Sequence, residues 1–297
     1  MKTALYWMQA ALLRTLLFAV AHLPFARRQV VMGAIVEWVV RLTPPLRARA
    51  MANLALIWPE MDEERRRAIT FAAARNAGRT LTGIWFNADL ARACADLPAT
   101  GPGLDALREA KSQGRGALVV SGHFGQWETI RHVLKREGME TGAIYRPNNN
   151  PYYEPVFRAG IELGGQPIIP KGKSGNREML RHLRAGGFFA ILPDQWVKDG
   201  LPLDFLGHQA LTSPAAAELA RRYDLPLVPA FAPVVGGTPQ ITFEDPIPAG
   251  EPAKMMSAYN ARLAAQVEAH PDQWHWFHLR WKAHPSSRSK KRKKKRR

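Results

Sequence analysis

The stretch GALVVSGHFGQWE, residues 116–128, decides the fold. Its apolar run, residues 117–121, is short and rich in aliphatic and β-branched side chains, which predicts a buried strand. Gly122 permits a turn directly afterwards, and a helix that begins soon after completes a strand-to-helix unit. His123 then lies in the connecting loop, at the carboxyl edge of the sheet, where open α/β folds place their ligands.

The spacing of His123 and Glu128 supports this reading of the loop. On one continuous helix, residues five apart differ in direction by about 140°, so the two side chains could not meet. With Glu128 in the first helical turn after a loop, they can converge. A carboxylate on one ring nitrogen fixes the histidine tautomer, which suits a general base for a hydroxyl. The plainer alternative is a histidine that caps a helix beside a carboxylate favoured by the helix dipole.

The sequence after residue 97 alternates short aliphatic runs with helical patterns. This alternation predicts an α/β fold with a central mixed sheet flanked by helices. The further expected strands are residues 143–145, 167–169, 188–192, 227–231 and 240–243, and the expected helices are residues 127–137, 152–163, 176–185, 214–223 and 253–269.

The N-terminal third predicts helices alone. Residues 4–25 and 30–40 are largely apolar, but Arg14 interrupts the first stretch. A charge at the centre of a spanning helix costs a few kcal/mol, so we expect helices that lie in or dip into a membrane interface. Two buried helices of a soluble domain are the alternative. Farther along, Asp62 is a candidate N-cap for a helix that ends near Trp85.

Charge and cysteine content limit the partners. The lone Cys94 excludes an intrachain disulfide framework and a multi-cysteine zinc site. The net charge is +17, but nine cations lie within residues 288–297, and without them the body carries +8. This charge fits nucleic acid, anionic lipid headgroups or an acidic carrier protein. The tryptophans of residues 274–281 alternate with cations and could stack on bases, meet a membrane or pack, and we favour packing with interfacial contact.

These patterns divide the chain into three predicted segments. Residues 1–96 form a helical membrane-associated region, and residues 97–284 form the α/β domain. Residues 285–297 contain no apolar side chain beyond Pro285 and are predicted to be a disordered basic tail.

The motif GHFGQWE closely resembles the H-x4-D/E box of glycerolipid and lipid A acyltransferases. Its form is typical of the bacterial lipid A biosynthesis (lauroyl/myristoyl) acyltransferase family, and the resemblance covers roughly residues 10 to 283. Two features depart from the family pattern: Thr82-Gly83 stand where an acidic residue is expected, and the basic tail is no family feature. The further motifs in family order are NLALIWPE (53–60), NAGR (76–79), YRPN (145–148) with Asn150-Pro151, KGK (171–173), LPDQ (192–195), FLG (205–207) with Ala210 and Thr212, PDQW (271–274) and RWK (280–282).

The resemblance implies a glycerolipid acyltransferase-like fold at the cytoplasmic face of the cell inner membrane. The implied reaction moves an acyl chain from an acyl carrier protein thioester to a hydroxyl of a lipid A precursor, a phosphorylated glucosamine lipid, without cofactor or metal. His123 would be the general base and Glu128 its orienting partner. The backbone amides around Gly125 would stabilise the oxyanion.

The same resemblance suggests how the acceptor is held. Arg146 and Arg158 would bind its phosphate or the charge of the transition state. The alternative is that either arginine pairs with Glu154 or Glu162 on a solvated face.

Three further residues are candidates for substrate binding. Asp194 follows the expected strand 188–192 and should lie at the same sheet edge as His123, where it could order an arginine or the sugar, or simply cap a helix. Lys171 and Lys173 flank a glycine in a loop suited to phosphate, although surface lysines are usually just solvated.

Two alternative functions stay open at this point. The first is an acyltransferase that acts on another lysolipid or on a phosphatidylinositol mannoside. The second is a non-enzymatic nucleic-acid-binding protein, which the basic tail and Trp-rich end support but which leaves the apolar N-terminus unexplained. We therefore expect anionic membrane, and no nucleic acid, as a partner.

Overall fold

The computed structural model describes residues 2–282, so the predicted basic tail lies outside the described residues. Helices alone build the N-terminal third, as predicted. Asp62 caps the fourth of them, since its side chain accepts a hydrogen bond of 2.6 Å from the Arg65 amide. The five helices are α1 (Lys2–Ala21), α2 (Phe25–Leu42), α3 (Pro44–Ile57), α4 (Glu63–Trp85) and α5 (Asn87–Ala93).

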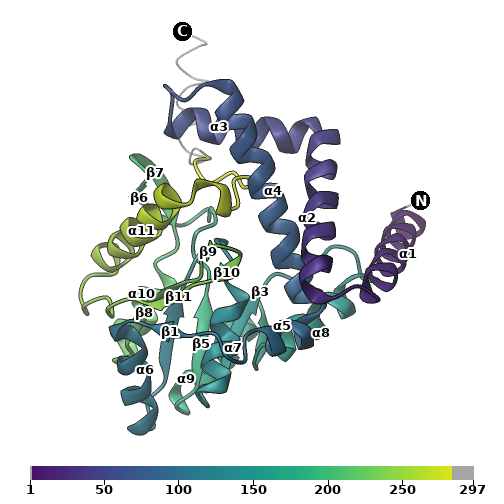
Figure 1. The fold of residues 1–297 in the computed structure, drawn as a ribbon. Helices are drawn as coiled ribbons and strands as arrows, with labels where there is room; N and C mark the ends of the chain where they lie inside the picture. Colours follow the sequence, from purple (N-terminus) through teal and green to yellow (C-terminus); the bar gives the residue numbers. More distant parts are fainter. Residues whose placement is uncertain (1, 283–297) are drawn as a thin grey trace.

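A seven-stranded sheet forms the centre of the rest of the chain (Figure 1). Its strands pair in parallel, except that β8 and β11 are antiparallel, so the predicted mixed sheet is confirmed. In spatial order the strands are β1 (Ala99–Thr100), β11 (Ile241–Phe243), β8 (Leu227–Phe231), β2 (Ala117–Val120), β5 (Phe188–Ile191), β3 (Thr141–Tyr145) and β4 (Ile168–Pro170).

Two small antiparallel hairpins lie outside this sheet. One consists of β6 (Leu201–Phe205) and β7 (His208–Thr212), beside α11 (Pro252–Ala269), and the other of β9 (Val234–Val235) and β10 (Thr238–Pro239). The short 3-10 helix η1 (Pro271–Gln273) follows α11.

Helices cover both faces of the sheet, and strand β2 shows why. Val119 packs in one buried cluster with side chains of α6 (Pro102–Ser112) and α7 (Glu128–Arg136), whereas Leu118 and Val120 pack in another, to which α4 and α11 contribute side chains. Successive residues of a strand point to opposite faces, so a run without polar residues is buried on both. The other helices are α8 (Glu154–Leu163), α9 (Lys173–Arg184), α10 (Ala215–Tyr223) and α11, of which α9, α10 and α11 contribute to the second cluster.

Helix α1 stands at the side of the molecule (Figure 1). Among the described residues, Thr3–Ala21 is the one helical segment long and apolar enough to cross a membrane by length and composition, with a mean hydropathy of 1.4 and 11% of it buried. Its Trp7, Leu12 and Phe18 side chains are exposed. The Arg14 guanidinium donates to the Tyr152 carbonyl at 3.3 Å.

Candidate active site

His123 lies in the loop between β2 and α7, at the carboxyl edge of the sheet, as predicted. The preceding glycine makes this position possible. A Cβ on Gly122 would lie 2.8 Å from the Leu263 side chain on α11, closer than real Cβ contacts. The small residue therefore allows the loop to pass against α11.

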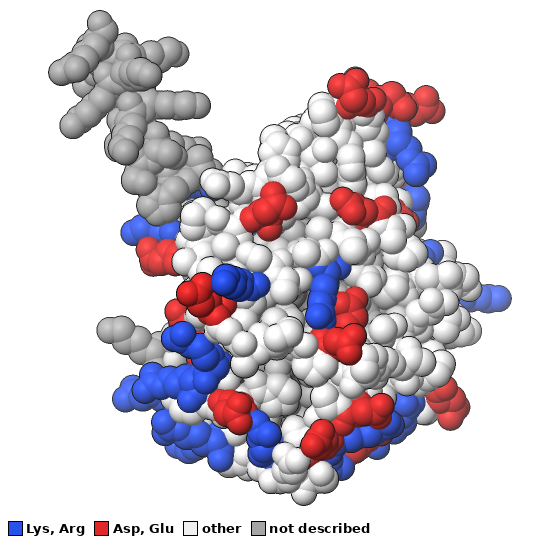
Figure 2. Space-filling model, turned by 90° about the vertical axis from the view of Figure 1, so that its left-hand side faces the viewer, with Lys and Arg blue, Asp and Glu red and all other residues white. Residues whose placement is uncertain are grey.

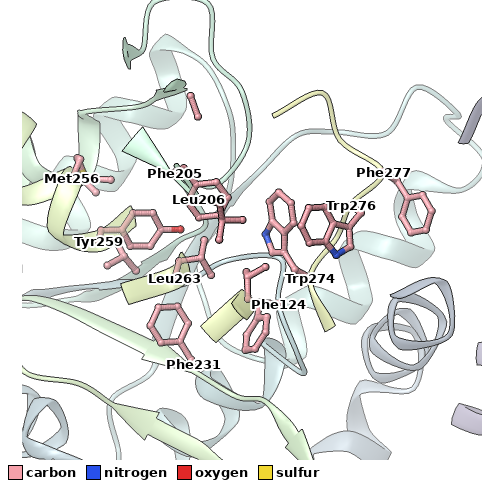
Figure 3. Close-up of a cluster of buried hydrophobic side chains, with 14 of the residues drawn as sticks. Phe124, Phe205, Leu206, Phe231, Met256, Tyr259, Leu263, Trp274, Trp276 and Phe277 are labelled. Carbon is pink, nitrogen blue, oxygen red and sulfur yellow. The ribbon is translucent and has the colours of Figure 1, made fainter. Parts of the chain in front are cut away.

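The segment that follows α11 hydrogen-bonds to this loop. The His275 amide donates to the His123 carbonyl, and the Gly125 amide donates to the Gln273 carbonyl, each at 3.0 Å. Trp274 and Trp276 lie side by side in the buried cluster that also contains Phe124 (Figure 3), with ring centroids 4.8 Å apart. The packing predicted for the Trp-rich segment is confirmed for these two tryptophans.

Helix α4 of the N-terminal region also contacts the loop that carries His123. On α4, the Thr80 hydroxyl donates to the Gly125 carbonyl at 3.0 Å and accepts from the Gln126 side-chain amide at 3.0 Å. The Asn76 amide donates to the Gln273 carbonyl, also at 3.0 Å. The histidine loop is thus fixed by contacts from both ends of the chain.

The ring of His123 is held by Asp194. The Asp194 Oδ1 atom lies 2.8 Å from His123 Nδ1, while Oδ2 accepts from the His123 amide at 2.8 Å and from the Trp274 indole at 3.0 Å. An ionised carboxylate can only accept, so Nδ1 carries the ring proton and donates it. This leaves the lone pair of the neutral imidazole on Nε2. The prediction that Asp194 shares the sheet edge of His123 is confirmed, but it neither orders an arginine nor caps a helix.

The electrostatics of this pair favour an ionised Asp194. Its side chain is only 1% exposed, and burial acts to raise its pKa. The positive charge that His123 carries when its ring is protonated, together with the hydrogen bonds from His123, outweighs burial and holds the pKa of Asp194 well below its usual range. The carboxylate therefore stays charged at neutral pH and can stabilise an imidazolium.

Glu128 does not hold His123, which corrects the expected His–Glu contact. Glu128 begins α7, as predicted, but its Oε2 atom accepts from Arg131 Nη1 at 3.1 Å. Arg131 is buried and also donates to three backbone carbonyls. A buried guanidinium without a counterion is costly, so Glu128 stays with Arg131. The sequence signal for this pair is a glutamate three residues before an arginine on one helix.

Gly125 has a structural role rather than the expected oxyanion role. Its amide is taken by Gln273, and the next amide, of Gln126, donates to the Ala232 carbonyl at 2.9 Å. Gly125 has φ +57°, and a Cβ there would lie 2.1 Å from the Ala232 oxygen. Only glycine fits this left-handed turn beside β8.

The predicted phosphate-binding residues are spread over the segments that follow β3 and β4. Arg146 follows β3 and is exposed, 3.5 Å from the Asn149 side chain. The Lys171 amide donates to the Tyr145 carbonyl at 2.8 Å, so the two loops are neighbours, and Lys173 begins α9. Arg158 pairs with Glu162 at 2.7 Å on an exposed face, which is the alternative considered for it.

Three residues beside His123 were not predicted as site residues. Gln195 Nε2 lies 3.1 Å from His123 Nε2 and 2.9 Å from His278 Nε2. The ring of His275 lies 4.4 Å from that of His278 and 6.3 Å from that of His123. Gln195 directly follows Asp194 in the LPDQ motif, and this position was the sequence signal that could have identified it as a site residue. Within residues 2–282, no group of three or more His, Cys, Asp or Glu side chains could hold a metal ion.

The family follows from comparison with known proteins. The model of the family described as bacterial lipid A biosynthesis acyltransferase matches residues 1–283. The chain belongs to this family. It is 22% identical over 271 residues to the lipid A biosynthesis acyltransferase of Haemophilus influenzae, covering 88% of this chain and 83% of the relative. It is 27% identical over 249 residues to the lipid A biosynthesis lauroyltransferase of Escherichia coli, covering 78% of each. These relatives support an acyltransferase activity.

Three histidines with lowered pKa values predict that the folded protein loses stability in acid. Burial lowers the pKa of His278 and of His132 to about 4, with nearby positive charge as a lesser cause, and the pKa of His275 also lies well below its usual value. A folded pKa below the unfolded value of about 6.5 means that the unfolded chain binds more protons, so stability falls as pH drops from about 6.5 towards 4. We expect the Tm to be lower by about 5 °C or more at pH 5 than at pH 7.5.

Thermal unfolding in detergent at the two pH values measures this effect. His132→Leu removes one of the three groups and should narrow the Tm difference, whereas substitution of the exposed His22 by glutamine should leave it unchanged. A Tm that is independent of pH over this range would contradict the prediction that these three histidines stay neutral in the folded protein.

Proposed function

We propose that this acyltransferase moves a fatty acyl chain from an acyl carrier protein thioester to a hydroxyl of a lipid A precursor, a phosphorylated glucosamine lipid. The named activities of the relatives support the acceptor class. The observation that carries the mechanism is the 2.8 Å contact between Asp194 and His123 Nδ1. It leaves Nε2 as a base at the edge of the sheet.

In the proposed reaction, His123 Nε2 takes the proton of the acceptor hydroxyl as the hydroxyl oxygen attacks the thioester carbonyl. The tetrahedral intermediate then collapses, the carbon–sulfur bond breaks, and the imidazolium returns the proton to the leaving thiolate. A hydroxyl is too weak an acid to attack unaided at neutral pH, and a positioned base contributes about 10²- to 10⁴-fold in rate. Asp194 stabilises the imidazolium that exists between the two proton transfers.

Candidate donors for the oxyanion lie at the start of α7. The amides of Trp127 and Glu128 have no acceptor among the described residues, and the helix dipole favours negative charge at this end. The Trp127 ring also lies 5.3 Å from the His123 ring, centroid to centroid. We propose these two amides in place of the amides around Gly125.

We assign the acceptor phosphate to Arg146 and Lys171, with Lys173 as a third candidate. These residues follow β3 and β4, which lie two and three strands from β2 in the sheet. Neighbouring strands are about 4.8 Å apart, which puts the phosphate about 10 to 14 Å from the histidine. A phosphorylated sugar lipid can span this separation.

Membrane association is supported by the apolar surface of the first two helices. On α1 these side chains are Leu5, Trp7, Met8, Leu12 and Phe18, and on α2 they are Val30, Trp38, Val39 and Leu42, all exposed. An apolar surface of this kind suits the lipid interface, where the acceptor resides. We propose the cytoplasmic face of the inner membrane as the location.

Nucleic-acid binding fits the described residues less well. Trp274 and Trp276 are 2% and 0% exposed, so they cannot stack on bases. On the face shown in Figure 2, basic side chains gather at the lower left and acidic side chains lie among them. Several arginines are already paired with carboxylates.

His123→Ala tests the proposed function. We expect it to lower acyl transfer by at least about 100-fold, because the base is removed. The assay incubates the full chain with labelled acyl carrier protein thioesters and a lipid A precursor in mixed micelles, and mass spectrometry identifies the product. His208→Ala, on β7, is the matched control and should retain transfer. Full transfer by His123→Ala would overturn the histidine as base.

A further inference from the structure

The side chain of Gln195 bridges two histidines in the candidate active site. Its single amide nitrogen lies 3.1 Å from His123 Nε2 and 2.9 Å from His278 Nε2. An amide nitrogen carries two hydrogens and accepts none, so in this arrangement Gln195 donates one hydrogen bond to each ring. Both ring nitrogens must then present a lone pair.

The protonation of each histidine agrees with this arrangement. His123 donates its Nδ1 proton to Asp194, so its free lone pair is on Nε2. Burial, followed by the nearby charge of His123, lowers the pKa of His278 to about 4, so this ring is neutral at pH 7 and can accept through Nε2. Gln195 therefore occupies the lone pair that catalysis would use.

We propose that Gln195 caps the general base: its amide occupies the lone pair on His123 Nε2, so that water cannot use the base, and only the acceptor hydroxyl displaces the amide. The hydrogen bond from Gln195 to His278 keeps the Gln195 side chain in place. This proposal rests on the proposed function, because it concerns the same base and the same thioester. His123 is 23% exposed at its side chain, so water can reach the site. Without the cap, a base next to a bound thioester would activate water for attack on the carbonyl as readily as it activates an alcohol.

The reaction that the cap suppresses is hydrolysis. In it, His123 Nε2 takes a proton from water as the water oxygen attacks the thioester carbonyl. The carbon–sulfur bond breaks, the proton passes to the leaving thiolate, and the products are a free fatty acid and the carrier thiol. The acceptor hydroxyl differs from water because its lipid and its phosphate are bound elsewhere, and this binding favours displacement of the amide from His123.

His278 is the positioning residue in this account. When the acceptor displaces Gln195 from His123, the second hydrogen bond of 2.9 Å holds the amide beside the reacting oxygen. Gln195 thus distinguishes a bound hydroxyl from free water.

The test measures two products from one labelled acyl carrier protein thioester. Free fatty acid is measured without acceptor, and acylated lipid is measured with a lipid A precursor, for the wild type, Gln195→Ala and Gln195→Met. Methionine keeps the length of the side chain but has no N–H. For both variants we expect the ratio of hydrolysis to transfer to rise about tenfold or more, which corresponds to about 1.4 kcal/mol, the scale of one hydrogen bond. His278→Phe should raise the ratio in the same direction.

The controls separate this proposal from the proposed function. Gln113→Ala, at an exposed position after α6, should leave the ratio unchanged. Adding His123→Ala to Gln195→Ala should abolish the extra hydrolysis, because water needs the same base. If the wild type transfers acyl chains but hydrolysis and transfer fall together in both Gln195 variants, the cap is overturned and Gln195 only orients the ring. A wild type that transfers nothing would overturn the proposed function, and the cap with it.

Discussion

Asp194→Asn is expected to lower the rate of acyl transfer by about 10²- to 10⁴-fold, although the protein still folds. The asparagine carbonyl can replace Oδ2 and accept from the His123 amide and the Trp274 indole, as the carboxylate does now. Its NH₂ group then faces His123 Nδ1, which must accept instead of donate. The ring proton moves to Nε2, and the base is lost.

The kcat of purified Asp194→Asn, measured with carrier thioester and lipid acceptor, checks this expectation. Asp199→Asn, at an exposed position on the same connection, is the matched control and should keep the wild-type kcat. If Asp194→Asn retains the wild-type kcat, Asp194 does not set the tautomer of His123.

Glu128→Gln is expected to lower the free energy of unfolding by about 3 to 5 kcal/mol, because it leaves the buried Arg131 guanidinium without its counterion. The side chains of the pair are only 10% and 4% exposed. Since Glu128 does not contact His123, the kcat of the folded variant should stay within a few-fold of wild type. Chemical denaturation in detergent, followed by far-UV circular dichroism, measures the loss.

Glu162→Gln is the matched control for this variant. It breaks the ion pair with Arg158, whose side chain is 51% exposed, and should cost less than about 1 kcal/mol. A Glu128→Gln protein with normal stability and no transfer activity would show that Glu128 takes part in the chemistry after all.

The local structure around His123, Glu128 and Asp194 was predicted correctly from the sequence. The predicted side-chain contact was wrong, because it joined His123 to Glu128 instead of Asp194. The loop position of His123 and the helical start at Glu128 follow from local signals: the aliphatic run, Gly122 and the five-residue spacing. The contact between His123 and Asp194 depends on β2 and β5 being neighbours in the sheet. Strand order is a property of the whole topology, and no local pattern states it.

The fold was predictable wherever a local signal was strong. Asp62 marked the start of α4, and the aliphatic runs marked β2, β5 and β8. Helix α6 was missed, although Leu104, Leu107 and Ala110 repeat at the three-residue spacing of a buried helical face. The hairpin of β6 and β7 was also missed, because its alternating pattern includes a proline and is only partly buried.

A double-mutant cycle on transfer activity tests the central claim most directly, namely that His123 and Asp194 act as one unit. Residues that share one catalytic step show strongly non-additive losses. We predict that His123→Ala combined with Asp194→Asn transfers acyl chains no more slowly than His123→Ala alone, while Glu128→Gln slows kcat by the same small factor with or without His123. The claim would be contradicted if the rate losses of His123→Ala and Asp194→Asn multiplied in the double variant. It would also be contradicted if Glu128→Gln slowed kcat only in the presence of His123.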